Sequence, residues 1–225
     1  MFAINLVTTL SLFVFTVASP FVADSVPFPR VDLEQEVIQV APFNSVELRN
    51  GGRVFVRHGA RQSVTVVKGN SDEITFTVEG SRLVIDKVKS SRRGHDLEIE
   101  IVTPNINGLA VNNGGVLQTV GDFSGQTALA VSVNQGGIVD ARSIAVQSVT
   151  ASVYSGGRIF VRPQAALVAS VAQGGAITYW GKPQVTSSIK HGGVVEEGEP
   201  TDFDKPLSEV GVYAPPVPTG RRIHP

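Results

Sequence analysis

Short alternations of apolar and polar residues dominate the chain between Val46 and Val195. Clear examples are RVFVR at 53–57, EITFTV at 73–78 and DLEIEIV at 96–102. A period of two residues is typical of β-strands with one buried face, whereas an amphipathic helix repeats every three to four residues. Turn-forming stretches such as NGG at 50 and KGN at 68 separate the segments. The pattern predicts an all-β domain of short strands.

Pairs of glycines recur within this strand-like region. Their first members are separated by intervals of 22, 20, 18 and 18 residues, and they are Gly114, Gly136, Gly156, Gly174 and Gly192. Three positions before each lies an apolar residue, namely Val111, Val133, Val153, Val171 and Ile189. Three positions after each lies another, namely Leu117, Val139, Ile159, Ile177 and Val195. The same frame fits Gly51, with Leu48 before it and Val54 after it.

An interval of about twenty residues favours a β-solenoid, in which each coil stacks in parallel on the next at about 4.8 Å. A single coil cannot bury its apolar positions, but stacked coils turn them into continuous internal ladders. Glycine adopts a positive φ without penalty, so each pair is expected to turn a corner and let successive backbones approach. We expect more degenerate coils between Gly51 and Gly114. The segments before and after the coils are expected to cover the open β-edges at the ends.

The chain divides into four predicted parts. The first carries an apolar block from Ile4 to Ala18 that is typical of a secretory signal peptide cleaved after Ala18, although no Lys or Arg precedes the block. The alternative is an uncleaved N-terminal anchor, because the stretch is long enough to span a membrane. The predicted parts are the signal peptide or anchor at 1–23, a lead-in segment at 24–42, the β-solenoid domain at 43–198 and a Pro-rich, mostly disordered tail at 199–225. Either reading of the first part predicts a secreted, periplasmic or cell-surface protein.

Composition narrows the possible functions. The formal net charge is −1 and only 17% of residues are charged, so the chain lacks the basic field that nucleic acids require. The chain has no cysteine, which excludes disulfides, thiol catalysis and cysteine-bound zinc. Its four histidines are scattered without metal-ligand spacing, and no phosphate-binding or nucleotide-binding motif is present. We therefore expect no metal, no cofactor and no nucleic-acid partner.

Candidate catalytic groups are sparse. Glycoside hydrolysis requires two carboxylates about 5–10 Å apart. Between Leu109 and Val195 the only acids are Asp122 and Asp140, which lie at different distances from their glycine pairs and hence in different columns. We interpret both as solvated turn residues and assign no catalytic residue.

Two features are candidates for binding. The polar residues that directly precede the glycine pairs form one predicted column, composed of Asn113, Gln135, Ser155, Gln173 and His191. Such a column is either a structural ladder of hydrogen bonds or part of a binding face. Trp180 is the single tryptophan, suited to stacking on a sugar or to packing at the end of the coils. The basic stretch KVKSSRRGH at 87–95 is a solvated loop or a docking patch for acidic surfaces.

The chain resembles the family of putative auto-transporter adhesins with a head GIN domain. The resemblance covers Phe43 to Gly198 and depends on NSVELRNGGRVFV, on LEIEIVTPNINGLAV, on the paired-glycine coils and on YWGKPQV followed by GGVV. It implies a single-stranded right-handed parallel β-helix exported by bacteria. The family has no established catalytic residues, so the resemblance supplies none.

These observations together predict an exported, non-catalytic binding module of the cell envelope or extracellular space, adhesin-like in function. Its mechanism is multivalent contact along one face, with a glycan or a cell-surface protein as partner. A membrane is contacted only through the N-terminal segment, if that segment is uncleaved. The alternatives are a carbohydrate-active β-helix enzyme and a purely structural envelope protein.

Overall fold

A computed structural model describes residues 36–87 and 97–210. The predicted signal segment at 1–23, most of the basic stretch at 87–95 and the chain after residue 210 lie outside the described residues. The described residues form fifteen strands in one sheet, with two short 3-10 turns, η1 (Ser71–Glu73) and η2 (Pro200–Asp202). The all-β class is therefore confirmed.

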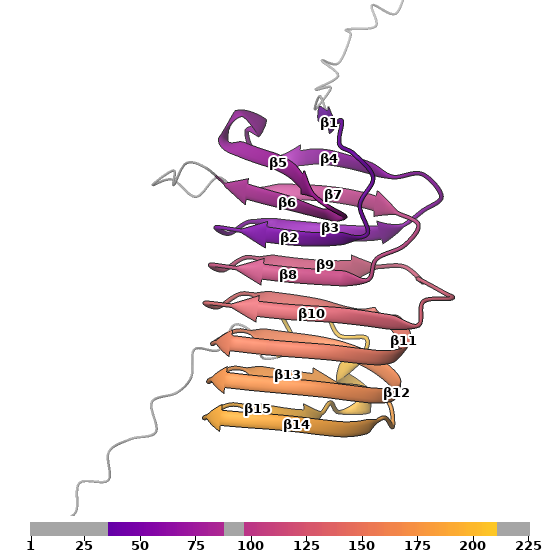
Figure 1. Ribbon diagram of the computed structural model, residues 1–225, viewed down its shortest axis with the longest axis vertical. Helices are drawn as coiled ribbons and strands as arrows, with labels where there is room; N and C mark the ends of the chain where they lie inside the picture. Colours follow the sequence, from indigo (N-terminus) through magenta and orange to yellow (C-terminus); the bar gives the residue numbers. More distant parts are fainter. Residues whose placement is uncertain (1–35, 88–96, 211–225) are drawn as a thin grey trace, which may run out of the picture. The chain divides into compact units, whose positions relative to one another are not determined.

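The sheet curls so that its strands lie in a front layer and a back layer (Figure 1). The front layer contains β6 (Arg82–Lys87), β2 (Ser45–Arg49), β8 (Gly108–Asn112), β10 (Ala128–Asn134) and β14 (Gln184–His191). The back layer contains β7 (Glu98–Thr103), β3 (Arg53–His58), β9 (Val116–Val120), β13 (Ala176–Tyr179) and β15 (Val194–Glu197). Two long strands, β11 (Ile138–Ser155) and β12 (Arg158–Gln173), belong to both, because their first parts pair with back strands and their second parts with front strands.

The predicted apolar columns are aligned by parallel pairing. In the front layer the register joins Leu48, Val111, Val133, Val153, Val171 and Ile189 in order. In the back layer it joins Val54, Leu117, Val139, Ile159, Ile177 and Val195. All of these side chains except Ile189 and Val195 are buried. Those two lie on the last strands of each layer, where no further strand of the described chain covers them.

The two glycines of a pair serve different purposes. Gly136 has φ +81°, and a Cβ added there would meet nothing within 4 Å. Gly137 has φ +98°, and a Cβ there would lie 2.5 Å from Val111 Cγ1 and 3.1 Å from the Gly115 carbonyl oxygen of the preceding corner. The first glycine is therefore required by backbone conformation alone, and the second also by the close approach of neighbouring corners.

The N-terminal part departs from the regular order. The strand β2 lies between β6 and β8, and β3 lies between β7 and β9. The chain therefore places β6 and β7 on one side of β2 and β3, and then places β8 and β9 on the other side. The segment between Gly51 and Gly114 also contains β4 (Ser63–Lys68) and β5 (Ile74–Glu79), which pair antiparallel with β7 and β6. A tight turn at Gly80, with φ +65°, reverses the chain between β5 and β6. This segment is thus not simply a series of degenerate coils in chain order.

The two ends of the sheet differ in whether a neighbouring segment covers them. At one end β1 (Glu36–Ile38), from the predicted lead-in segment, pairs antiparallel with β4. After β15 the chain does not cover the other end. Residues 199–210, which we call the strap, pack instead on the outer surface of the back layer, where Phe160, Trp180 and Leu207 form a second buried cluster. Within the described chain, β14 pairs only with β12 and β15 only with β13. The expectation that the region after Val195 covers the end is wrong for residues 199–210, because their apolar side chains bind to the back layer.

Candidate functional site

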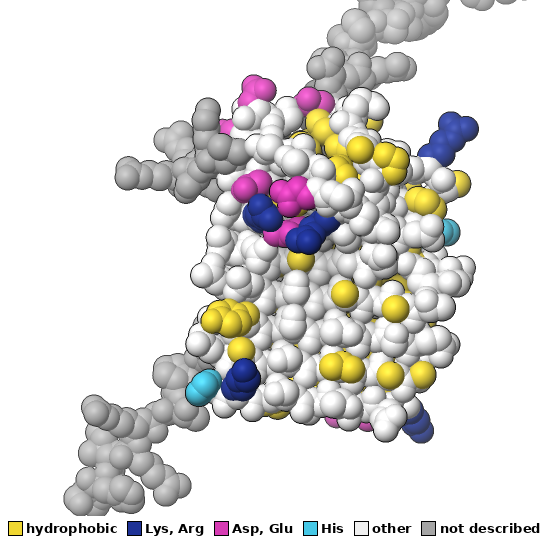
Figure 2. Space-filling model, viewed as in Figure 1, with side chains coloured by type: hydrophobic (Ala, Val, Ile, Leu, Met, Phe, Trp, Pro, Cys, Tyr) yellow, Lys and Arg dark blue, Asp and Glu magenta, His cyan; other side chains and the backbone are white. Residues whose placement is uncertain are grey.

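The outer surface of the front layer carries small, neutral side chains in register. One outward column joins Ser132, Ser152, Ser170 and Ser188. The next outward column joins Gly108, Ala130, Thr150, Val168 and Thr186. Buried residues such as Val131 and Ala151 alternate with them, which is why the small side chains face outward. Figure 2 shows this face as largely uncharged below a cluster of charges near its N-terminal end.

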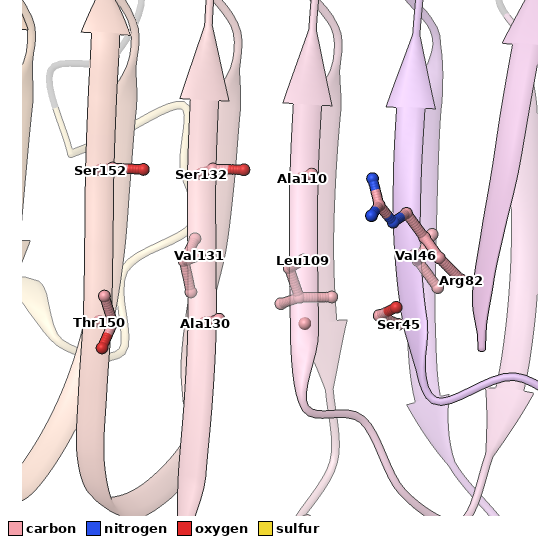
Figure 3. Close-up of a pocket in the computed structure, with 11 residues that line it drawn as sticks. Ser45, Val46, Arg82, Leu109, Ala110, Ala130, Val131, Ser132, Thr150 and Ser152 are labelled. Atoms are coloured by element: carbon pink, nitrogen blue, oxygen red, sulfur yellow. The ribbon is translucent and has the colours of Figure 1, made fainter. Parts of the chain in front are cut away.

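A shallow hollow of about 310 Å³ lies on this face, over β8 and β10. It exists because Gly108 has no side chain and Ala110 has a short one, while Ser45 and Arg82 border it on one side and Thr150 and Ser152 on the other. In Figure 3 the Arg82 side chain crosses β2, and the hydroxyls of Ser132 and Ser152 point toward β8. The hollow therefore combines hydroxyl groups, methyl groups and one guanidinium at its edge.

Glu47 is the centre of the charge cluster that borders the hollow. Its side chain is only 4% exposed, and it accepts hydrogen bonds from Arg49 Nε (2.6 Å), Arg82 Nη1 (2.8 Å) and Asn112 Nδ2 (2.7 Å). Burial of the carboxyl raises its pKa, but the hydrogen bonds from Arg49, Arg82 and Asn112 and the positive charge of Arg49 together outweigh burial, so the pKa lies below its ordinary value. The carboxylate thus joins β2, β6 and β8 and fixes Arg82 at the edge of the hollow.

The predicted polar column lies at the glycine corner beside this face. Asn113 Nδ2 donates a hydrogen bond to Asn50 Oδ1 (3.0 Å), and Asn50 Nδ2 donates to Asp86 Oδ1 (2.8 Å), so side-chain hydrogen bonds join the corners after β8 and β2 to the end of β6. Farther along, the register joins Ser155, Gln173 and His191. In the described chain no side-chain hydrogen bond connects Gln135, Ser155, Gln173 and His191 with one another. Their role in binding stays a prediction.

Trp180 is not brought together with that column. It follows β13, at the end of the strand away from the glycine corner, and only 6% of it is exposed. Its indole Nε1 donates to the Glu199 carbonyl oxygen (3.0 Å), and its ring packs against Phe160 and, edge-on, against Phe203. The structure therefore gives Trp180 a packing role between the back layer and the strap.

Asp140 is not a solvated turn residue. It is 3% exposed and forms a buried ion pair with Arg142, whose Nε and Nη2 lie 2.9 and 2.8 Å from its carboxylate oxygens. Arg142 Nη1 also donates to the carbonyl oxygens of Asp202 (2.8 Å) and Phe203 (2.9 Å) in the strap. The pair fastens the strap to the back layer. Asp122 is exposed, as expected.

Within 36–87 and 97–210, no three histidine or acidic side chains are close enough together to hold a metal ion. In the same ranges, no helix has the length and apolar character needed to cross a membrane.

Sequence reasoning missed two parts of this face. The serine column was detectable, because its members are 20, 18 and 18 residues apart, the same intervals as the later glycine pairs. The cluster around Glu47 was not, because its members come from β2, β6 and β8 and no local pattern connects them.

Comparisons with known proteins agree with the resemblance noted in the sequence. A family model described as "Putative auto-transporter adhesin, head GIN domain" matches residues 42–128 and 123–183. Among curated proteins, none matches the chain significantly.

Three solved structures are similar over most of their length. A putative adhesin from Bacteroides fragilis is 20% identical with a TM-score of 0.39, over 72% of this chain and 95% of its own. A putative cell adhesion protein from Clostridium sporogenes is 11% identical with a TM-score of 0.39, over 74% and 99%. A putative lipid binding protein from Parabacteroides distasonis is 16% identical with a TM-score of 0.30, over 74% and 96%. Because the family model covers well over half of the sequence, this chain belongs to the family of putative auto-transporter adhesins with a head GIN domain.

Proposed function

We propose that this protein is an exported, non-catalytic binding module, adhesin-like in function, that acts at the cell surface or outside the cell. In this proposal the chain winds as a single-stranded right-handed parallel β-helix, and its front face between β8 and β14 is the binding surface. The apolar N-terminal block and the family membership support export.

The observation that carries the proposal is the aligned column of Ser132, Ser152, Ser170 and Ser188 on a face that the strap leaves free. Hydroxyl groups repeat there at the spacing of neighbouring strands, about 4.8 Å. Methyl groups of Ala130, Thr150, Val168 and Thr186 lie in the adjacent outward column. A flat, neutral surface of this kind suits an extended neutral polysaccharide, which offers hydroxyls and C–H groups along its length. Each contact is weak, and repetition along the face supplies the affinity.

The proposal is tested by retention of the full chain on insoluble neutral polysaccharides such as cellulose, chitin and β-glucans. We expect wild-type protein to be retained and to release no soluble sugar. A triple variant, Ser132→Ala with Ser152→Ala and Ser170→Ala, is expected to be retained at least fivefold less. A matched corner variant, Gln135→Ala with Gln173→Ala, tests whether the predicted polar column takes part.

Each outcome separates the alternatives. Retention that survives the serine changes but not the glutamine changes would move the site to the glycine corner. Release of soluble sugar would favour a carbohydrate-active enzyme. Absence of retention on every polysaccharide, together with no capture of cell-surface proteins, would leave a structural envelope role.

A further inference from the structure

A second hollow, of about 370 Å³, lies on the back of the molecule between Arg162 of β12, the ends of β13 and β15, and the strap. Arg162, Lys182 and Glu197 border it, and Trp180 and Phe203 contribute the aromatic part of its lining. Its volume is within the range of about 300–1,000 Å³ that is usual for small-molecule sites. None of its charged residues belongs to the front face, so it is independent of the proposed function.

Arg162 is held in place without a carboxylate partner. Its guanidinium carbon lies 4.9 Å from the centre of the Phe203 ring, and Phe203 is fixed by its edge-on contact with Trp180 and by the hydrogen bond that its carbonyl oxygen accepts from Arg142. Arg49, Arg57, Arg82 and Arg142 each pair with a carboxylate. In the described chain no carboxylate comes within 4.0 Å of Arg162. Its planar donors therefore remain available for a bidentate contact with an anion.

The other residues that line the hollow indicate which further groups a ligand would carry. Lys182 adds a second cation, and Glu197 is the single carboxylate, so the charged lining is +1 in total (two cations minus one anion). Glu197 can accept hydrogen bonds from hydroxyl donors. Gly198 also lines the hollow, and its backbone lies so close to the indole of Trp180 that a Cβ there would meet the ring at 2.3 Å.

We infer that this hollow binds a carboxylate-bearing saccharide of the uronic acid type. The carboxylate of the sugar pairs with Arg162, with Lys182 as the second cation. Hydroxyls of the ring donate to Glu197, and the C–H face of the ring contacts the aromatic edge formed by Trp180 and Phe203.

The single tryptophan gives this site its own readout. Emission of Trp180 is followed while the full chain is titrated with galacturonic acid oligomers, their methyl esters and neutral galactose oligomers. We expect the acidic oligomers alone to change the emission, with an affinity that weakens as salt is added. Arg162→Gln is expected to weaken binding at least tenfold and Lys182→Gln about threefold, with Arg162→Lys between the two. Arg53→Gln, an exposed cation elsewhere on the back layer, is the matched control and is expected to have no effect.

Several outcomes would overturn the inference. They are an unchanged Trp180 emission with every acidic oligomer at millimolar concentration, equal binding of the methyl esters, and undiminished affinity of Arg162→Gln, whose fold is checked by its unfolding midpoint. A peptide with a free C-terminal carboxylate that binds as well as the oligomers would overturn the saccharide class. None of these results bears on the serine column, because none of its serines lines this hollow.

Discussion

The front and back layers have the same kind of inward apolar column but differ in their outward side chains. Both have an unbroken inward column of Val, Leu and Ile aligned by the same kind of parallel register. On the back, the outward positions include Val116, Ile138 and Phe160, which the strap covers. In the two outward columns of the front layer they are Ser, Thr, Ala and Gly, apart from Val168. Since burial follows apolar area, these outward residues help to explain why the strap packs on the back layer and leaves the front layer uncovered.

The two layers also use charge differently. The back has a buried pair, Asp140 and Arg142, whose side chains are 4% and 7% exposed. The front has Glu47, also buried, but its partners Arg49 and Arg82 are 34% and 53% exposed. The pair on the back attaches a separate segment, whereas the cluster on the front joins neighbouring strands and leaves a guanidinium at the surface. We therefore expect substitutions on the back to cost more stability than those on the front.

The largest effect is expected from Arg142→Met. It leaves the Asp140 carboxylate buried without its partner and frees the strap, so the free energy of unfolding should fall by about 3–5 kcal/mol. Urea denaturation measures the loss. The matched front variant Arg49→Met should cost only about 1 kcal/mol, because Glu47 retains Arg82 and Asn112. Equal losses in the two variants would remove the contrast between the layers.

A second test for the buried pair is the double variant Asp140→Asn with Arg142→Met. Because the double variant has no unpaired buried carboxylate at position 140, it should recover part of the free energy of unfolding that Arg142→Met loses.

The next largest effect concerns the corners where the front layer turns into the back layer. Gly137→Ala should lower the free energy of unfolding by about 2–4 kcal/mol, since the added methyl overlaps Val111 and the Gly115 carbonyl oxygen and φ is positive. Gly136→Ala should cost about 1–2 kcal/mol, because only the positive φ opposes it. Thermal unfolding of the two variants measures the difference, and a ranking in the opposite order would contradict the close-approach explanation.

Acid should weaken the front cluster in a way that Glu47→Gln reveals. The folded pKa of Glu47 is below its ordinary value, so its contribution is complete above the unfolded pKa, about 4.3, and is lost as the pH falls through the folded value. At pH 7 the variant should be less stable by about 1–2 kcal/mol. Urea denaturation at several pH values should show this gap narrowing below the unfolded pKa. A gap that stays constant with pH would show that the charge of Glu47 does not matter.

The smallest effect on stability is expected on the open front face. The triple serine-to-alanine variant at 132, 152 and 170 should unfold within about 0.5 kcal/mol of wild type, because these side chains face outward and no strap packs on them. Denaturation measured alongside polysaccharide retention separates lost binding from lost folding. A large destabilisation would mean that the serine column is structural.

Much of this arrangement could be predicted from the chain. The alternation of residues and the recurring glycine pairs gave the strand class and placed Val111, Val133 and Val153 in one column, because both signals are local and repeat at a constant interval. Asp122 and Asp140 looked alike in the sequence, but only Asp122 is exposed, because a distant segment of the chain packs near Asp140. Asp140 follows its glycine pair as a turn residue would, yet Arg142 and the strap bury it.

The sequence by itself determined that this protein is all-β, that its apolar positions align in columns and that glycine is needed at each corner. Only the tertiary structure decided that β2 lies between β6 and β8, that residues 199–210 cover the back and that the front stays open with Arg82 at its edge. The physical reason is the range of the interactions. Alternation and corner strain act between neighbours in the chain or in register, whereas the strap and the Glu47 cluster depend on contacts between segments 35 to 65 residues apart, which no periodicity specifies.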